Sequence, residues 1–223
     1  MTESLNTEAL NIDVISDVVC PWCFIGKRRL EAALKLYEEK YPDRPAPVVS
    51  WHPYQLNPDM PREGILRKDY IAQKFGGRGY PSERLQSIGA PLGIVFAFDK
   101  IIRQPNTLAA HSLIQRAGQH GNQAQMKEAL LRAYFLDGAD LTDEATLTRI
   151  AASAGMDKEE AEACLDSEEA RDLVSQEEDS ARRIGVEGVP YFIFNRKLAV
   201  SGAQEAEALL GAMEESEKAD AQA

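Results

Sequence analysis

Residues 12–23 read IDVISDVVCPWC, an apolar run rich in β-branched side chains that ends in two cysteines, Cys20 and Cys23. Such a run is typical of a buried strand. Apolar residues at helical spacing follow at once, over residues 21–40. A strand, a C-x-x-C pair and a helix in this order are typical of a thiol–disulfide redox site.

The start of the helix gives the two cysteines different predicted roles. Cys20 would meet unpaired backbone N–H groups and the positive end of the helix dipole, which stabilise a thiolate and lower its pKa. Cys23, one turn later, is close enough to form a disulfide with Cys20 and is expected to be buried beneath the helix. We therefore predict Cys20 as the attacking thiol and Cys23 as the resolving thiol.

Two other interpretations of the pair remain open. A C-x-x-C pair can be half of a zinc site, but a structural zinc ion needs two further ligands at a matching spacing. The remaining candidates form no second C-x-x-C or H-x-x-x-H pair; they are Cys164, His52, His111 and His120. Two inert cysteines are the last alternative. We expect redox chemistry without a bound metal.

The composition limits the class of protein. The chain has 223 residues, 44% of them hydrophobic and 27% charged, which suits one globular domain with an insertion or two small domains sharing a core. Its net charge of −11, from 25 basic and 36 acidic residues, disfavours nucleic acid and anionic membrane surfaces as partners.

Residues 1–10 do not resemble a signal peptide, and no run approaches the roughly 20 apolar residues of a membrane span. We expect a cytoplasmic protein, where three cysteines favour a catalytic pair over a disulfide framework.

The order of predicted elements indicates the fold. A strand, a helix and a second strand form a βαβ unit, whose two strands are expected to be parallel. A block of helices follows, and after it come a helix, two strands joined by a hairpin turn at Asn195-Arg196, and a terminal helix. The predicted strands are residues 12–18, 48–56, 191–194 and 197–201.

With the helical block removed, the order β-α-β-α-β-β-α is the minimal thioredoxin-like architecture. The fold class is therefore predicted as α/β, a thioredoxin-like fold with a mixed four-stranded core sheet and a large inserted α-helical domain that packs as a lid. The predicted parts are residues 1–57 for the first half, 58–166 for the insertion, 167–214 for the second half and 215–223 for a frayed polar tail.

Val189 and Pro190 are predicted as the second part of the site. In this architecture the residue before the third strand lies opposite the C-x-x-C pair. A cis bond before Pro190 would leave the Val189 N–H and C=O groups free to pair with an extended substrate; an ordinary trans proline at a strand start is the alternative. Pro21 and Trp22 lie between the cysteines, and Trp22 is expected either to offer apolar surface to a substrate or to pack locally.

The roles of two other residues are left open. His111, in the first turns of an insert helix, is either a residue that reaches the active-site groove or a half-buried helix histidine. Cys164 is either a small buried hydrophobic residue or a second resolving thiol. No histidine lies between Cys20 and Cys23, so we expect a smaller lowering of the Cys20 pKa than in strongly oxidising periplasmic enzymes, and a mid-range reduction potential.

Several motifs together resemble the DsbA-like branch of the thioredoxin superfamily, specifically its FrnE-like group. The first is DVVCPWCFIGKRRL at residues 17–30, and the similarity covers nearly the whole chain. The other motifs are WHPYQLNP at 51–58, PNTLAAH at 105–111, RAYF at 132–135, GVEGVPYF at 185–192 and VSGAQ at 200–204. The resemblance implies a thioredoxin fold with a helical insertion, dithiol oxidoreductase activity centred on Cys20 and Cys23, and Val189-Pro190 as the cis-proline pair.

The same superfamily includes 2-hydroxychromene-2-carboxylate isomerases and kappa-class glutathione transferases, which are similar in layout and activate glutathione. Those proteins typically have Ser at the position of Cys20 and lack the second cysteine. We therefore predict a thiol–disulfide oxidoreductase that acts on protein or small-molecule thiols and disulfides without a cofactor, with glutathione as a candidate substrate, as a monomer or homodimer. A glutathione-dependent isomerase or transferase and a non-catalytic binding or chaperone-like module are the alternatives.

Overall fold

A mixed four-stranded sheet forms the centre of the computed structural model, which describes residues 9–76 and 79–220. The strand order is β2-β1-β5-β6; β1 is parallel to β2 and antiparallel to β5, and β6 is antiparallel to β5. The strands are β1 (Asn11–Ser16), β2 (Val48–Pro53), β5 (Tyr191–Phe194) and β6 (Leu198–Ser201). The predicted fold class is confirmed.

The central strand β1 joins the two halves of the chain. Val14 pairs with Trp51 on β2 and with Phe192 on β5. Val14 and its neighbour Ile15 are both buried, on opposite faces of the sheet. A strand covered on both faces reads as a continuous apolar run, which explains the composition of this segment.

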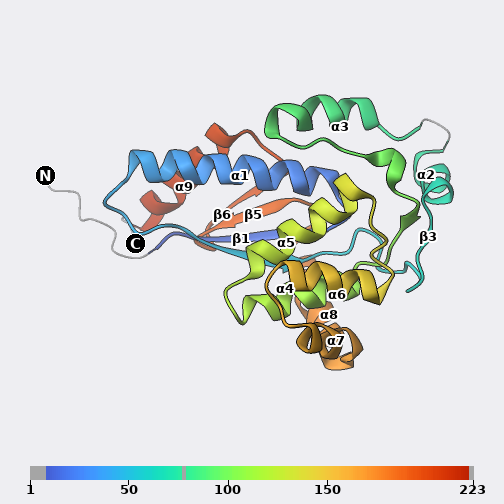
Figure 1. The fold of residues 1–223 in the computed structure, drawn as a ribbon. Coiled ribbons are helices and arrows are strands. Elements are labelled where there is room, and N and C mark those ends of the chain that lie inside the picture. Colours follow the sequence, from blue (N-terminus) through green and yellow to red (C-terminus); the bar gives the residue numbers. More distant parts are fainter. Residues whose placement is uncertain (1–8, 77–78, 221–223) are drawn as a thin grey trace, which may run out of the picture.

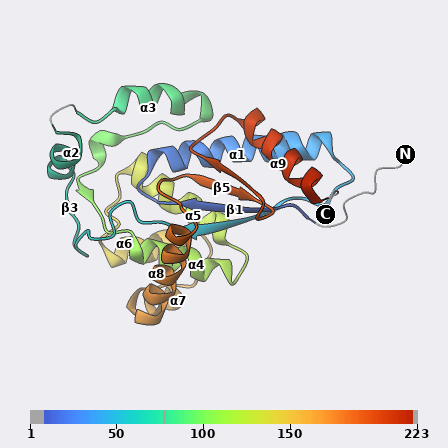
Figure 2. The same cartoon turned by 180° about the vertical axis from the view of Figure 1, so that it is seen from behind.

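Helices cover both faces of the sheet. Helices α1 (Pro21–Lys40) and α9 (Ala206–Asp220) pack against each other on one face, as Figure 1 shows. On the other face α8 (Glu168–Arg183) packs on β2 and on α4 (Leu108–Gly118), as Figure 2 shows from behind. None of the helices in the described part of the chain combines the length and the apolar character needed to cross a membrane.

The segment between β2 and α8 divides into two parts. The arm runs from β3 to β4 (residues 65–76 and 79–104), and the helical cluster runs from α4 to α7 (residues 108–166). The arm lies beyond the first turn of α1 (Figure 1) and begins at a two-residue ladder, β3 with β4, that the sequence did not predict. In the cluster, α4 and α5 pack on β2. The elements are β3 (Ile65–Leu66), α2 (Arg67–Phe75), α3 (Ser82–Gly89), η1 (Ala90–Leu92), η2 (Phe98–Lys100), β4 (Arg103–Gln104), α5 (Gln123–Arg132), η3 (Ala133–Asp137), α6 (Glu144–Ser153) and α7 (Lys158–Asp166).

Phe24, the residue after Cys23, connects the sheet core to this segment. Its ring centroid lies 6.1 Å from that of Phe96 in the arm and 6.2 Å from that of Phe135 in η3. All three rings are buried in one apolar cluster that also contains residues of the sheet. The inserted segment therefore holds the start of α1 by packing directly behind the cysteines.

The end of the chain differs from the predicted frayed tail. Helix α9 continues to Asp220 instead of stopping near residue 214. Its last turns are held by Glu217, which is largely buried and accepts a hydrogen bond of 2.7 Å from Tyr37 Oη. This bond joins residues 180 positions apart, so the local polar composition did not reveal it. Residues 221–223 lie outside the described part.

Candidate active site

Cys20 occupies the N-cap position of α1, at the carboxyl end of β1. Its carbonyl oxygen accepts the backbone N–H of Cys23 at 3.0 Å, and Pro21 supplies the first helical residue, where a missing N–H group costs no hydrogen bond. The first turn of the helix contains no acidic side chain. The helix start therefore presents its positive end to the Cys20 sulfur.

The two thiols titrate in opposite directions. A hydrogen bond from the Cys23 thiol lowers the pKa of Cys20, although burial opposes this effect. Burial raises the pKa of Cys23 well above its ordinary value, and the negative charge that forms on Cys20 raises it further. Both cysteines are free and buried. The arrangement can hold a thiolate on Cys20 while Cys23 stays protonated.

Val189 and Pro190 lie directly against the thiols. The Cys20 Sγ atom is 3.6 Å from the carbonyl oxygen of Val189, and the Val189–Pro190 peptide bond is cis. The close approach of Pro190 to α1 depends on Gly26, because a Cβ atom there would lie only 2.8 Å from the Pro190 Cγ atom. The fold thus brings together two segments 169 residues apart.

Pro21 and Trp22 are both partly exposed at the start of α1. The Trp22 ring packs against the apolar core on one side. The guanidinium of Arg84, on α3 of the arm, lies 5.8 Å from the centre of the same ring. Trp22 therefore packs locally and stays partly exposed, and its contact with a substrate remains a prediction.

His111 is fully buried and reaches the site through Asp17. Its Nε2 atom lies 3.3 Å from Asp17 Oδ1, while Asp17 Oδ2 accepts the backbone N–H of Leu56 at 2.9 Å. Burial alone would raise the pKa of Asp17, but its contacts with His111, the Leu56 N–H group and the charge of Lys127 together lower it. The sequence did not identify Asp17 as a site residue, although its position three residues before Cys20 was a possible signal.

Lys127 is the most unexpected member of the site. Its side chain is 1% exposed and lies near Cys23, Cys20 and Asp17, whose negative charges favour its protonated form. Burial outweighs these charges and lowers the pKa of Lys127 to about 8. A buried amine with such a pKa can exchange a proton near neutral pH. No sequence signal marked this lysine on an amphipathic helix.

Cys164 lies apart from these groups, on α7. It is buried in the main apolar cluster, and burial raises its pKa. Both features are those of a small hydrophobic residue. Within residues 9–76 and 79–220, no three His, Cys, Asp or Glu side chains are grouped so that they could hold a metal ion.

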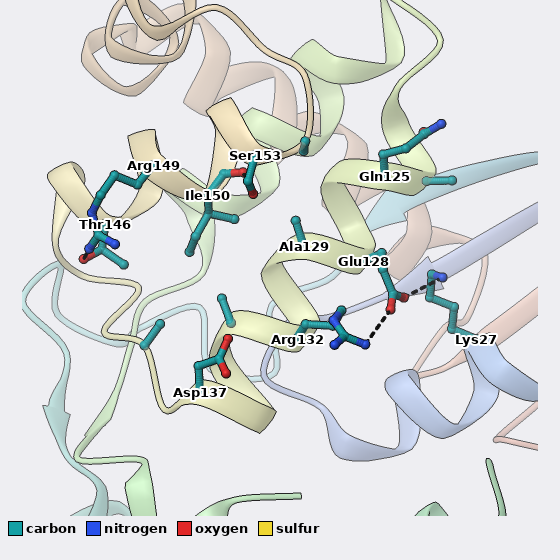
Figure 3. Close-up of a pocket in the computed structure, with 14 residues that line it drawn as sticks. Lys27, Gln125, Glu128, Ala129, Arg132, Asp137, Thr146, Arg149, Ile150 and Ser153 are labelled. Atoms are coloured by element: carbon teal, nitrogen blue, oxygen red, sulfur yellow. Dashed lines mark hydrogen bonds and ion pairs between the residues drawn. The ribbon is translucent and has the colours of Figure 1, made fainter. Parts of the chain in front are cut away.

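A wide groove of about 960 Å³ opens between α5 and α6, away from the thiols. Figure 3 shows Glu128 between Lys27 and Arg132, with oxygen-to-nitrogen distances of 2.7 Å and 3.8 Å. Arg149, on the opposite wall, donates a hydrogen bond to Thr146. Glu128 is therefore paired within the groove by Lys27 and Arg132, and the candidate active site is the thiol pair.

The comparisons with known proteins agree with this geometry. A family model described as "DSBA-like thioredoxin domain" matches residues 11–214. The probable DsbA oxidoreductase SCO1869 from Streptomyces coelicolor is 27% identical, with a TM-score of 0.81 over 93% of this chain and 89% of that chain. The cytosolic disulfide reductase DsbM from Pseudomonas aeruginosa, whose structure is described with GSH, is 19% identical, with a TM-score of 0.61 over 95% of this chain and 98% of that chain. The uncharacterised protein YwbO from Bacillus subtilis is 24% identical over 82% of this chain and 86% of its own length.

Proposed function

Because this chain belongs to the DSBA-like thioredoxin domain family, we propose that it is a thiol–disulfide oxidoreductase that uses Cys20 and Cys23 as a dithiol pair. One observation carries the proposal: the two thiols lie together at the start of α1, and their pKa values are shifted in opposite directions. The attacking group in disulfide exchange is a thiolate, and the group that completes the exchange must lose its proton later.

In the first step, the Cys20 thiolate attacks one sulfur of a substrate disulfide. A bond forms between Cys20 Sγ and that sulfur, the substrate disulfide breaks, and the second substrate sulfur leaves as a thiolate. In the second step, Cys23 loses its proton and attacks Cys20 Sγ, which forms the Cys20–Cys23 disulfide and releases the first substrate sulfur. The reverse sequence oxidises a substrate dithiol, and the two directions use the same atoms.

Lys127 is the candidate proton acceptor for Cys23. The thiol is buried and its pKa is raised, so it cannot ionise readily without a nearby base. With its pKa lowered to about 8, a fraction of Lys127 is neutral at physiological pH and can take up this proton. The Lys127 ammonium that results then stabilises the Cys23 thiolate as it attacks.

Val189 is the proposed docking point for the substrate backbone. Its carbonyl oxygen lies beside Cys20 Sγ, so an extended peptide that pairs with this residue would hold its own cysteine next to the thiolate. Pro190 is buried and cannot donate a backbone hydrogen bond. Substrate pairing on this side therefore depends on Val189 rather than on Pro190.

Glutathione is included in the proposal as a small thiol substrate. The similar fold of DsbM, a disulfide reductase described with GSH, supports testing it here. DsbM is also described as cytosolic, and we place this protein in the same reducing compartment as part of the proposal. A glutathione-dependent isomerase, the alternative reaction, would need one activated thiol and would not require Cys23.

Reduction of insulin disulfides by dithiothreitol tests the reaction. Cys20→Ser should abolish catalysis, whereas Cys164→Ser, a control at a buried cysteine outside the site, should keep it. Cys23→Ser should accumulate a mixed disulfide with its substrate that mass spectrometry can detect at Cys20. Wild-type activity of Cys20→Ser would overturn the proposal, and glutathione-dependent turnover that survives Cys23→Ser would support the isomerase instead.

A further inference from the structure

An exposed arginine, Arg84, lies at the mouth of the thiol site. Arg84 is exposed on α3, and its guanidinium carbon lies 5.8 Å from the centre of the Trp22 ring. Trp22 itself follows Cys20 by two positions in the sequence. Within the described part of the chain, the Arg84 guanidinium forms no ion pair. A guanidinium held over an aromatic ring keeps its hydrogen-bond donors free for an incoming anion.

Helices α2 and α3 together carry a net positive charge, opposite in sign to that of the whole chain. Helices α2 and α3 carry four cationic side chains, Arg67, Lys68, Lys74 and Arg84, and two acidic ones, Asp69 and Glu83. The whole chain has 25 basic and 36 acidic residues. A local excess of positive charge at the mouth of a site attracts anionic substrates even when the rest of the surface repels them.

A second arginine of the arm is buried with neutral partners. Within the described residues, Arg67 donates hydrogen bonds to Gln104 Oε1 and Tyr134 Oη and lies 4.7 Å from the centre of the Tyr80 ring. Burial raises the pKa of Tyr80 to about 12, and the negative charge of Cys20 contributes to this rise. The charge of Arg67 is therefore not cancelled by a carboxylate and adds to the positive potential at the site.

We propose that Arg84 and Trp22 form a subsite for a carboxylate next to the reacting disulfide, so that the preferred substrates are disulfides with acidic groups beside the cysteine. The inference rests on the proposed function. A substrate cysteine aligned beside Val189 contacts Cys20, and the side chains next to it reach the Trp22 side of the mouth. The carboxylate then lies against the Arg84 guanidinium, while the exchange itself proceeds on the sulfur atoms as described above.

Single-turnover exchange with two synthetic peptide disulfides tests this subsite. The peptides differ only in the residues that flank each cysteine, glutamate in one and glutamine in the other. The reduced protein is mixed with each peptide at low salt, and acid-quenched samples are separated to count the thiols released. We expect the glutamate peptide to react about fivefold faster, which corresponds to about 1 kcal/mol, the upper end for an exposed charge pair.

Three variants make the test specific. Arg84→Gln should bring the two rates together, and Arg84→Lys should restore most of the difference because it keeps the charge. Lys35→Gln, which removes an exposed positive charge about 20 Å further along α1, should leave the difference unchanged. Equal rates for the two peptides in the wild type overturn the subsite while leaving the proposed function intact. A protein that exchanges neither peptide overturns both.

Discussion

Lys127, on helix α5 of the inserted segment, interacts through its charge with the thiol of Cys23 on helix α1. The two residues are far apart in the chain, and both side chains are 1% exposed. The positive charge of Lys127 lowers the pKa of Cys23, which burial raises, and ionisation of Cys23 in turn raises the pKa of Lys127. Each charge therefore stabilises the other inside the buried site, which is the basis for proposing a proton transfer between the two groups.

Lys127→Met should slow the second step of disulfide exchange. The substitution keeps the length of an unbranched side chain and removes the amine, so Cys23 loses its proton acceptor. We expect release of the first substrate sulfur to slow at least about a hundredfold at neutral pH, the lower end of the losses typical of removing a general base. Rapid-quench measurement of the mixed disulfide at Cys20 gives this rate directly.

The pH profile separates this role from a structural one. In the wild type the rate of the second step should rise through about pH 8, as Lys127 becomes neutral and able to accept a proton. Lys127→Met should lose this inflection, whereas Lys35→Met, an exposed control on α1, should retain it. An unchanged profile in Lys127→Met would show that another group accepts the proton.

Gly26→Ala should loosen the contact between α1 and the proline loop. The added Cβ would lie 2.8 Å from Pro190 Cγ and 3.3 Å from Phe192 Cζ, distances at which one element must move. We expect the free energy of unfolding to fall by about 1–3 kcal/mol, as for other overpacked positions, together with slower exchange at Cys20.

Gly211 provides the matched control for that substitution. It lies in α9, and a Cβ there would meet no atom within 4 Å. Gly211→Ala should therefore be neutral or raise the free energy of unfolding by up to about 1 kcal/mol, because alanine favours the helix. Denaturant unfolding of both variants gives the comparison, and an equal effect at both positions would contradict the steric explanation for Gly26.

The local sequence predicted the elements around the thiols well. The run before Cys20 and the proline after it predicted a strand and a helix start, and α1 begins at Pro21. The turn at Asn195 and Arg196 was also recognised, because its residues separate two short apolar runs. These features depend on neighbours in the chain, which is why sequence patterns reveal them.

The charged groups behind the thiols depend on distant neighbours. Lys127 follows Met126 on α5, and nothing in the local sequence indicates that its side chain is covered, but α5 packs on β2, α4 and α6 and leaves Lys127 buried. Asp17 is paired with His111, 94 residues away. Spacing within one helix or strand cannot reveal which segment covers it, so this part of the site required the structure.

His52 should make the stability of the protein depend on pH. Its Nε2 atom lies 2.9 Å from Asp13 Oδ1, and its Nδ1 atom is hydrogen-bonded to Glu177 on α8. Burial lowers the pKa of His52, but the bonds to Glu177 and Asp13 outweigh burial and raise it above 6.5. The stabilisation is complete below about pH 6.5 and is lost as the pH rises through the raised value.

His52→Gln should therefore remove part of this dependence. Between about pH 6 and pH 8.5, the free energy of unfolding of the wild type should fall relative to that of the variant, by about 1 kcal/mol for a partly buried ion pair. Urea unfolding at a series of pH values measures the difference. A difference that stays constant over this range would show that the charge of His52 does not hold α8 on the sheet.

Arg196→Gly should stabilise the hairpin between β5 and β6. Asn195 and Arg196 adopt left-handed conformations, with φ of 49° and 57°, as a type I′ turn requires. Glycine adopts this conformation without the steric cost of a Cβ atom, so the free energy of unfolding should rise by about 0.5–1 kcal/mol despite the greater freedom of the unfolded chain.

Asn195 is kept because its Oδ1 atom accepts the backbone N–H of Asn11 at 2.9 Å, which ties the turn to the start of β1. Ala199→Gly is the control, since Ala199 lies in β6 with a φ outside the left-handed region and should lose stability through the greater freedom of the unfolded chain. Equal shifts of the urea midpoint in the two variants would contradict the conformational explanation, whereas opposite shifts would support it.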